Sequence, residues 1–452
     1  MHPQRYSLTE GSIWKGMLLF AMPVFFGNVF QQLYNAFDAW CVGNFIGDEA
    51  LAAVSSSGSL IFMMVGFFNG VAMGAGVIIA RYYGARQYDA MRKAIHTAIA
   101  LGLATGVVLT VAGVALTPTI LRWMGTPEEV FPQSVAYFRY YFWGAIFVVM
   151  YNMFVGIFHA VGDSKHPLYY LIISTLVNVV LDMLFVAILG LGVGSAAIAT
   201  TVSQGVSAVL CFRQILRVDA PYRVNIRKIR FDRESLVQII RYGLPSGVQN
   251  SVIAIANVVV QSNINSFGKA AMAGCGSYSK LEGFVFLPVT CFSQALSTFV
   301  GQNLGAGNHG RVKQGVAFSV VCSCTMAEVI GGISYLCAPQ LIGFFSKSPE
   351  AIGFGVEHMQ TICLFYFLLA FSHCIAGVMR GAGKATVPMF TMLACWCVIR
   401  VSYISVAVKL VNRLTTVSWA YPITWTLSSI VFLIYFLKAD WMHTFDKELQ
   451  KA

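Results

Sequence analysis

Charge is what this sequence has least of. Asp, Glu, Lys and Arg make up only 11% of its 452 residues, whereas 57% are hydrophobic. A typical soluble domain carries about 25% charged residues. So little charge cannot cover a surface that faces water, which excludes an ordinary soluble protein. The composition is instead what a surface in contact with lipid requires.

Several motifs are missing as well. The first residues are polar and the apolar run after them is long enough to span a membrane, so we expect no cleaved signal peptide. The eleven cysteines lie mostly inside apolar runs without a His/Cys cluster, and we expect them to be packing residues rather than metal ligands. No P-loop or nucleophile motif occurs in any predicted loop. The sequence therefore predicts a protein that is not an enzyme and has no cofactor.

Long apolar runs are what the chain has in place of charge. A membrane-spanning helix needs about 20 predominantly apolar residues, and twelve runs meet that length. They predict an all-α polytopic membrane protein that is embedded in the lipid bilayer. The predicted spans are residues 17–41, 52–80, 94–116, 136–160, 168–189, 193–213, 238–265, 274–300, 315–338, 357–379, 388–409 and 416–437.

The basic residues are distributed unevenly between the loops. Most of the 30 Lys and Arg residues fall in alternate loops, and segment 213–241 is the richest. Loops rich in Lys and Arg face the cytoplasm. We therefore expect a multi-pass protein of the bacterial inner membrane with both termini in the cytoplasm. This distribution also explains the net charge of +11 without a nucleic-acid partner.

The two halves of the chain repeat each other with an offset of about 221 residues. "GIFHAVGDSKHP" at 156–167 aligns with "GVMRGAGKATVP" at 377–388, and Pro23 occupies the same place in the first span of its half as Pro245. Six spans per half give parallel repeats, which in transporters enclose a substrate path. The predicted domains are an N-terminal lobe at 1–212, a cytoplasmic linker at 213–237 and a C-terminal lobe at 238–452.

Ionisable residues inside spans are costly and usually functional. Asp38 lies in the first span, and Asn178 and Asp182 are spaced i, i+4 in the fifth, so they share one helix face. Thr200 in the sixth span adds a hydroxyl. Carboxylate, amide and hydroxyl oxygens suit a hard cation, and two nearby carboxyls also hold protons as a coupled pair. We predict a cation-coupling site that takes Na⁺ or H⁺.

The second half is chemically different. Tyr403 occupies the position equivalent to Asp182, and Ile399 occupies that of Asn178. The main charged residues in these spans are Lys280, Glu282 and Arg400. Glu282 either faces a substrate cavity or ties two helices together.

Three polar residues of the first half are further candidates for the cavity, because their polar atoms need partners away from lipid. They are Gln31, Tyr34 and Asn152.

The chain resembles the multidrug and toxic compound extrusion (MATE) family over nearly its full length. The stretches that carry the resemblance are "AMPVFFGNVFQQLYNAFDAWCVGNFIGDEALAAVS" at 21–55, "GDSKHP" with "LVNVVLD" at 162–182, "GSAAIAT" at 194–200 and "EGFVFLPVTCFSQALSTFVGQNLGAGN" at 282–308.

The resemblance implies two six-helix lobes arranged as a V, and export of amphipathic organic cations in exchange for inward H⁺ or Na⁺. The family's N-lobe cation site matches Asp38, Asn178, Asp182 and Thr200, and its helix-kinking proline matches Pro23. A glutamate that another branch of the family carries in the seventh helix is missing, which argues against a sodium site in the C-lobe.

Two functions from different classes follow. The first is an ion-coupled multidrug antiporter, working as a monomer on small organic cations. The second is a flippase for a lipid-linked precursor, which the wider superfamily fold also serves. A flippase needs several Arg or Lys residues around a pyrophosphate, and the spans contain few, so the antiporter is favoured.

Overall fold

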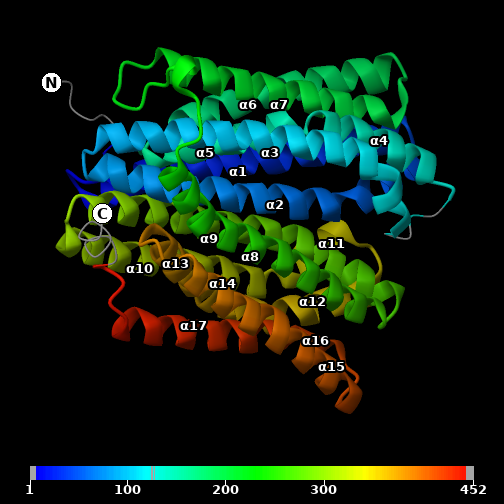
Figure 1. The fold of residues 1–452 in the computed structure, drawn as a ribbon. Coiled ribbons are helices and arrows are strands. Elements are labelled where there is room, and N and C mark those ends of the chain that lie inside the picture. The colour runs from blue at the N-terminus through cyan, green and yellow to red at the C-terminus, as the bar shows by residue number, and fades with distance from the viewer. Residues whose placement is uncertain (1–6, 124–125, 127, 444–452) are drawn as a thin grey trace. The chain divides into compact units, whose positions relative to one another are not determined.

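The computed structural model describes residues 7–123, 126 and 128–443, without the side chains of residues 48, 49, 51–60 and 62. All regular secondary structure in these residues is helical (Figure 1). Regions of apolar sequence form helices because a helix satisfies its own backbone hydrogen bonds, which lipid cannot do. The predicted all-α class is confirmed.

The helices of the first half run to Arg217. They are α1 (Ile13–Phe45), α2 (Asp48–Gly84), α3 (Tyr88–Trp123), α4 (Phe131–Trp143), α5 (Ala145–Ala160), α6 (Lys165–Asp182), the π-helical turn η1 (Met183–Ile188) and α7 (Gly192–Arg217).

The second half follows a short 3₁₀ turn, η2 (Ile226–Lys228). Its elements are α8 (Arg233–Asn265), α9 (Lys269–Gly305), α10 (His309–Leu336), α11 (Ala338–Phe345), α12 (Pro349–Ile362), the 3₁₀ turn η3 (Cys363–Phe365), α13 (Tyr366–Gly381), α14 (Thr386–Met392), the π-helical turn η4 (Leu393–Ile399), α15 (Arg400–Leu410), α16 (Leu414–Ser418) and α17 (Ala420–Lys438).

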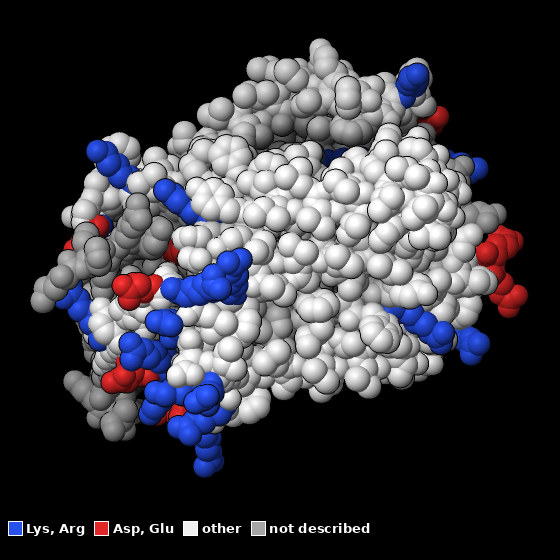
Figure 2. Space-filling model, turned by 90° about the horizontal axis from the view of Figure 1, so that it is seen from above, with Lys and Arg blue, Asp and Glu red and all other residues white. Residues whose placement is uncertain are grey.

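The predicted number of spans is confirmed. Within the described residues, eleven helices or continuous helical stretches are long and apolar enough to cross a membrane, and the pair α4 and α5, bent by 47°, makes twelve. Each predicted span falls on one of them. On the face in Figure 2, charged atoms lie mainly toward the two sides of the view, while uncharged atoms make up nearly all of the broad middle. An uncharged middle is the surface that the acyl chains of a bilayer favour.

The chain divides into two compact units, and the division does not follow the order of the sequence. Unit 1 contains Met22–Gly247, and unit 2 contains Leu8–Ala21 and everything from Val248 onward. The first helix of each half, α1 or α8, is therefore shared by both units. The boundary falls beside Pro23 in α1 and Pro245 in α8. The lobes drawn from the repeat, 1–212 and 238–452, stay a prediction.

The main helix crossing of unit 1 has a counterpart in unit 2. In unit 1, α5 crosses α2 so closely that a Cβ on Gly156 would lie 2.7 Å from the carbonyl oxygen of Ala72. In unit 2, α13 crosses α9 in the same way, and a Cβ on Gly377 would lie 2.4 Å from the carbonyl oxygen of Ser293. Both residues of the second crossing stand about 221 positions after those of the first, the offset of the repeat. The two halves therefore build equivalent scaffolds.

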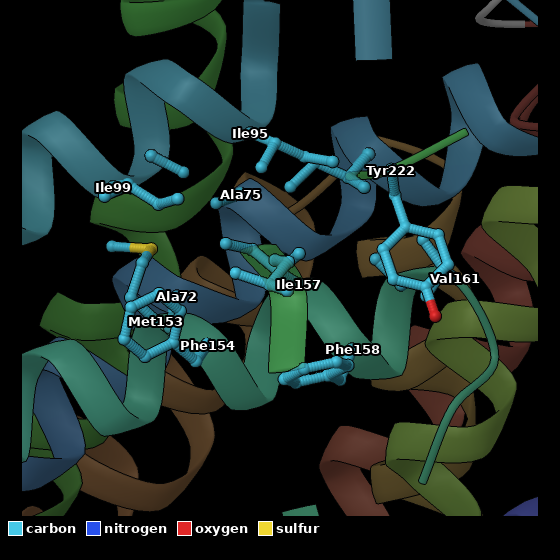
Figure 3. Close-up of a cluster of buried hydrophobic side chains, with 14 of the residues drawn as sticks. Ala72, Ala75, Ile95, Ile99, Met153, Phe154, Ile157, Phe158, Val161 and Tyr222 are labelled. Atoms are coloured by element: carbon cyan, nitrogen blue, oxygen red, sulfur yellow. The ribbon is translucent and has the colours of Figure 1, made fainter. Parts of the chain in front are cut away.

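The core of unit 1 includes part of the connection between the halves. Figure 3 shows Tyr222 beside a cluster of apolar side chains from α2, α3 and α5, such as Ile95 and Ile157. Tyr222 and Val224 are both buried. Arg92 Nε donates to the carbonyl of Pro221 at 2.9 Å, and the backbone N–H of Asn225 donates to His96 Nε2 at 3.1 Å. The part of the predicted linker between α7 and α8, residues 218–232, is thus attached to α3 rather than free.

Unit 2 holds the segment before α1 by similar means. Arg311, near the start of α10, donates to the backbone carbonyls of Leu8, Glu10 and Gly11 at distances between 2.8 and 3.2 Å. The side chain of Gln302 also accepts from the backbone N–H of Leu8 at 2.9 Å. In each unit, the third helix of one half therefore anchors the segment that leads into the other half.

Candidate functional site

Three helices of unit 1 bring the predicted coupling residues together. Asp38 comes from α1, Asn178 and Asp182 come from α6, and Thr200 comes from α7. All four are buried, and Asn178 and Asp182 are fully buried. Asp182 is the last α-helical residue of α6, directly before the π-helical turn η1. Such π-turns are frequent at functional sites because they redirect side chains and loosen the helix ladder.

Tyr34 and Ser203 join these helices at the edge of the cluster. The hydroxyl of Tyr34, one turn before Asp38 on α1, lies 3.3 Å from the Ser203 hydroxyl on α7. Ser203 Oγ donates to the carbonyl of Thr200 at 2.8 Å. Ser174 on α6 donates to the carbonyl of Ser203 at 2.6 Å, so α6 and α7 are also tied directly.

The two carboxyls of the cluster lie within electrostatic range of each other. Both are buried beside aromatic rings, because Tyr137 and Tyr141 of α4 stack with ring centroids 6.4 Å apart and both lie within electrostatic range of Asp38. In such surroundings a charge is poorly solvated and must be compensated by a cation or removed by a proton. A coupling site needs this property.

Most polar atoms of the cluster have no protein partner. Among the described residues, no hydrogen bond is made by the side-chain atoms Asp38 Oδ1, Asn178 Oδ1 and Nδ2, Asp182 Oδ1 and Oδ2, and Thr200 Oγ1. The amide of Asn178 lies beside the Asp182 carboxylate without reaching hydrogen-bond geometry.

Buried polar groups normally have partners, so this set of atoms is suited to a small ligand. Its carboxylate, amide and hydroxyl oxygens are the donors that a hard cation takes. No group of three or more His, Cys, Asp or Glu that suits a transition metal occurs within the described residues.

The predicted cavity residues lie in different places. Tyr34 belongs to the cluster, while Gln31, one turn earlier on α1, is partly buried. Asn152 on α5 donates to the carbonyl of Val148 in its own helix at 2.8 Å, so its amide nitrogen is bonded within α5. Glu282 belongs to unit 2, where it accepts a hydrogen bond from the Tyr278 hydroxyl at 2.9 Å.

Pro23 lies inside α1, at the boundary where the helix passes from unit 2 to unit 1. A proline inside a helix removes one backbone hydrogen bond and weakens the helix at that point.

Sequence reasoning missed four residues of this environment: Tyr137, Tyr141, Ser174 and Ser203. Tyr137 and Tyr141 stand four positions apart in "VAYFRYYF", so their common helix face was visible in the sequence. Nothing in the sequence indicated that this face lies against α1. Serine is a common residue in membrane spans, and no pattern in the sequence distinguishes Ser174 and Ser203 from the others.

Known proteins with a similar sequence are described as multidrug resistance or multidrug export proteins. The probable multidrug resistance protein YoeA of Bacillus subtilis is 28% identical over 396 residues, covering 86% of each chain. The probable multidrug resistance protein NorM of Thermotoga maritima is 26% identical, covering 97% of each chain. The multidrug export protein MepA of Staphylococcus saprophyticus is 22% identical and covers 84% of each chain.

Solved structures support the fold. A multidrug resistance MATE family transporter of the MOP superfamily in an outward-facing conformation superimposes with a TM-score of 0.89 at 24% identity, covering 96% of this chain and 98% of that one. A MOP superfamily transporter from Pyrococcus furiosus gives a TM-score of 0.88 at 24% identity over 98% of both chains. At this identity the likeness establishes the fold alone.

A sequence model of the MatE family matches the chain twice, at residues 23–184 and again at 245–405. The two matches start and end at equivalent points of the repeat, and together they cover well over half of the chain. The twelve helical spans and the two equivalent scaffolds agree with these matches. The chain therefore belongs to the MatE family, the multidrug and toxic compound extrusion transporters.

Proposed function

We propose that this protein is a secondary active antiporter that exports amphipathic organic cations in exchange for inward H⁺ or Na⁺. The observation that carries the proposal is the cluster of buried carboxylate, amide and hydroxyl atoms in unit 1 that have no protein partner. The relatives' descriptions as multidrug resistance or export proteins support the class of substrate.

Asp182 and Asp38 have different roles in this proposal. Asp182 is fully buried next to the π-helical turn, so its charge needs a bound cation or a proton in this state. Asp38 is the second acid and lies on α1, the helix that both units share. Binding or release of an ion by Asp38 and Asp182 changes the charge buried in unit 1. Because α1 carries Asp38 and also contributes residues to unit 2, a movement of α1 would affect both units. The coupling site is therefore assigned to the first half.

The test is efflux from vesicles that contain the purified protein. A fluorescent monovalent organic cation should be driven by an imposed pH gradient or by an imposed Na⁺ gradient, and should stop when the gradient is dissipated. Efflux that continues at the same rate without any ion gradient would contradict antiport and would indicate a passive pathway.

The stoichiometry can be measured in the same vesicles. One monovalent cation exchanged for one ion moves no net charge, whereas two ions per substrate would add about 2.3 kcal/mol per 100 mV of membrane potential. A rate and end point that do not respond to a clamped potential would exclude two-for-one exchange.

We further propose that the protein works as a monomer in the bacterial inner membrane, with both termini in the cytoplasm. The concentration of Lys and Arg in alternate loops supports this orientation. Labelling of single cysteines placed in the 218–232 segment should occur only from the cytoplasmic side. Labelling from the outside would reverse the orientation.

A further inference from the structure

Unit 2 contains a guanidinium that is buried without a carboxylate in contact. Arg400, the first residue of α15, is 2% exposed. Its Nε and Nη2 atoms donate to the Thr424 hydroxyl on α17 at 3.3 and 3.0 Å. The guanidinium also lies over the rings of Tyr421 and Trp396, 4.6 and 5.5 Å from their centroids. Arg400 makes no ion pair with any described residue.

Glu282 is the acid that lies within electrostatic range of Arg400, although the two groups are not in contact. It is partly buried on α9 and accepts a hydrogen bond from Tyr278, whose hydroxyl also lies 3.1 Å from that of Tyr366 on α13. The ring of His358 meets the ring of Tyr278 edge-on at 4.8 Å. The carboxylate is thus held in place by an aromatic network, with the guanidinium fixed nearby.

This arrangement resembles an occupied receptor for an organic cation. Aromatic faces with a nearby carboxylate are what quaternary ammonium and other organic cations bind. Here the faces of Tyr421 and Trp396 are covered by a cation that belongs to the chain. Arginine stays protonated even when buried, so it cannot leave the aromatic faces uncharged. A substrate cation that approached Glu282 would be repelled by Arg400 in a medium of low dielectric constant.

We propose that Arg400 is a built-in competitor of organic cations and determines which substrates unit 2 accepts. The guanidinium compensates Glu282 and covers the aromatic faces, so monovalent organic cations bind weakly in this unit, while neutral and zwitterionic amphiphiles are not penalised. This inference rests on the proposed function, in which amphipathic organic cations are the substrates, and it concerns how tightly unit 2 binds them. The sequence left open whether Glu282 faces a substrate cavity or ties two helices together, and the proposal joins these alternatives. The Glu282 carboxylate is the counter-ion of Arg400, and it becomes a substrate ligand only when Arg400 no longer compensates it.

The experiment measures binding of tetraphenylphosphonium to the full-length protein in nanodiscs by equilibrium dialysis, without an ion gradient. Arg400→Gln removes the charge and keeps hydrogen-bonding groups, and it should tighten binding about tenfold or more, since tenfold corresponds to only 1.4 kcal/mol of lost repulsion. Thr424→Val is the matched control, because it removes the hydrogen-bond acceptor and keeps the charge, and it should change affinity less than about threefold. Unchanged or weaker binding by a folded Arg400→Gln protein would overturn the proposal.

The double variant keeps the proposal testable if Arg400→Gln alone does not fold. Glu282→Gln should weaken binding, because Arg400 is then an uncompensated cation. Glu282→Gln with Arg400→Gln removes both charges and should return the affinity to about the wild-type value, within about threefold. If the double variant binds as weakly as Glu282→Gln, then Glu282 is a simple substrate ligand and Arg400 plays no part. Because the readout is binding at equilibrium, a failure of ion-coupled efflux would leave this result unaffected.

Discussion

In unit 1, the buried carboxyls of Asp38 and Asp182 retain polar atoms without a protein partner, whereas in unit 2 the carboxylate of Glu282 is hydrogen-bonded and lies near the fixed cation Arg400. The helix crossings behind these groups are equivalent, at Gly156 in one unit and Gly377 in the other. A duplicated scaffold can therefore keep its backbone packing while its buried charges diverge. This contrast supports the proposals that unit 1 exchanges a small ion and that Arg400 compensates Glu282 in unit 2.

The largest effect should come from removing the acid at the centre of unit 1. Asp182→Asn should express and fold but lose active efflux, so that the efflux rate falls to that of cells without the transporter. The reason is that the asparagine side chain cannot change its charge during the transport cycle. Drug resistance and dye efflux in cells measure this. Asp38→Asn should show the same defect more mildly.

Tyr403→Phe is the matched control in unit 2, because Tyr403 is the repeat equivalent of Asp182. It should keep wild-type efflux. Equal loss of efflux in Asp182→Asn and Tyr403→Phe would mean that the two units do not divide the chemistry as inferred. Normal efflux from a well-expressed Asp182→Asn protein would contradict the role of Asp182 in ion coupling.

Ion binding should stabilise unit 1 selectively. If Asn178 and Thr200 complete a sodium site, Na⁺ at a hundredfold excess over its dissociation constant should add about 2.7 kcal/mol relative to choline at fixed pH. Thermal unfolding in detergent measures the difference. It should disappear in Asp182→Asn and persist in Glu282→Gln. A stabilisation lost only in Glu282→Gln would place the ion in unit 2, and no stabilisation with efflux still driven by a pH gradient would leave a proton mechanism.

The equivalence of the two scaffolds can be tested with alanine substitutions. Gly156→Ala and Gly377→Ala should each destabilise the protein by about 1–3 kcal/mol, because the added Cβ would collide with a backbone carbonyl that cannot move freely. Gly332→Ala on α10 is the control, since no atom lies within 4 Å of its added Cβ and alanine favours helix. It should be neutral or slightly stabilising. Damage at only one of the two crossings would show that the scaffolds are not equivalent.

The smallest effect concerns the segments that lead into α8 and α1. Hydrogen bonds from the backbone N–H and then the hydroxyl of Ser235 hold the pKa of the Asp232 carboxyl below its usual value, as expected for a carboxylate at a helix N-terminus. Asp232→Ala should therefore cost about 1 kcal/mol at neutral pH.

Because the folded pKa of Asp232 is depressed, its contribution is present above the ordinary value of 3.8 and is lost as the pH falls through the folded value. Thermal unfolding of wild type and Asp232→Ala across this range should converge at low pH. Arg311→Ala, which removes three hydrogen bonds to backbone carbonyls of the segment before α1, should converge less, because those carbonyls do not titrate. A constant difference between wild type and Asp232→Ala at every pH would contradict the role of the carboxylate.

The spans, the repeat and the residues of the candidate coupling site could be identified from the sequence. The spans follow from the length of apolar segment that a bilayer requires, and the repeat follows from the offset of about 221 residues. The i, i+4 spacing of Asn178 and Asp182 places both on one face of a helix whatever that helix packs against. Local rules of this kind need no knowledge of other helices.

Only the tertiary structure decided which side chains from different helices meet. It placed Tyr137 and Ser203 beside the acids of unit 1, left the Asn152 amide bonded to its own helix, and set Arg400 on the faces of Tyr421 and Trp396. It also assigned residues 8–21 to unit 2 and the whole 213–247 segment to unit 1. The physical reason is that helix periodicity fixes the direction of a side chain on its own helix. Which charges become neighbours depends on close helix crossings, such as that at Gly377, which long-range packing determines.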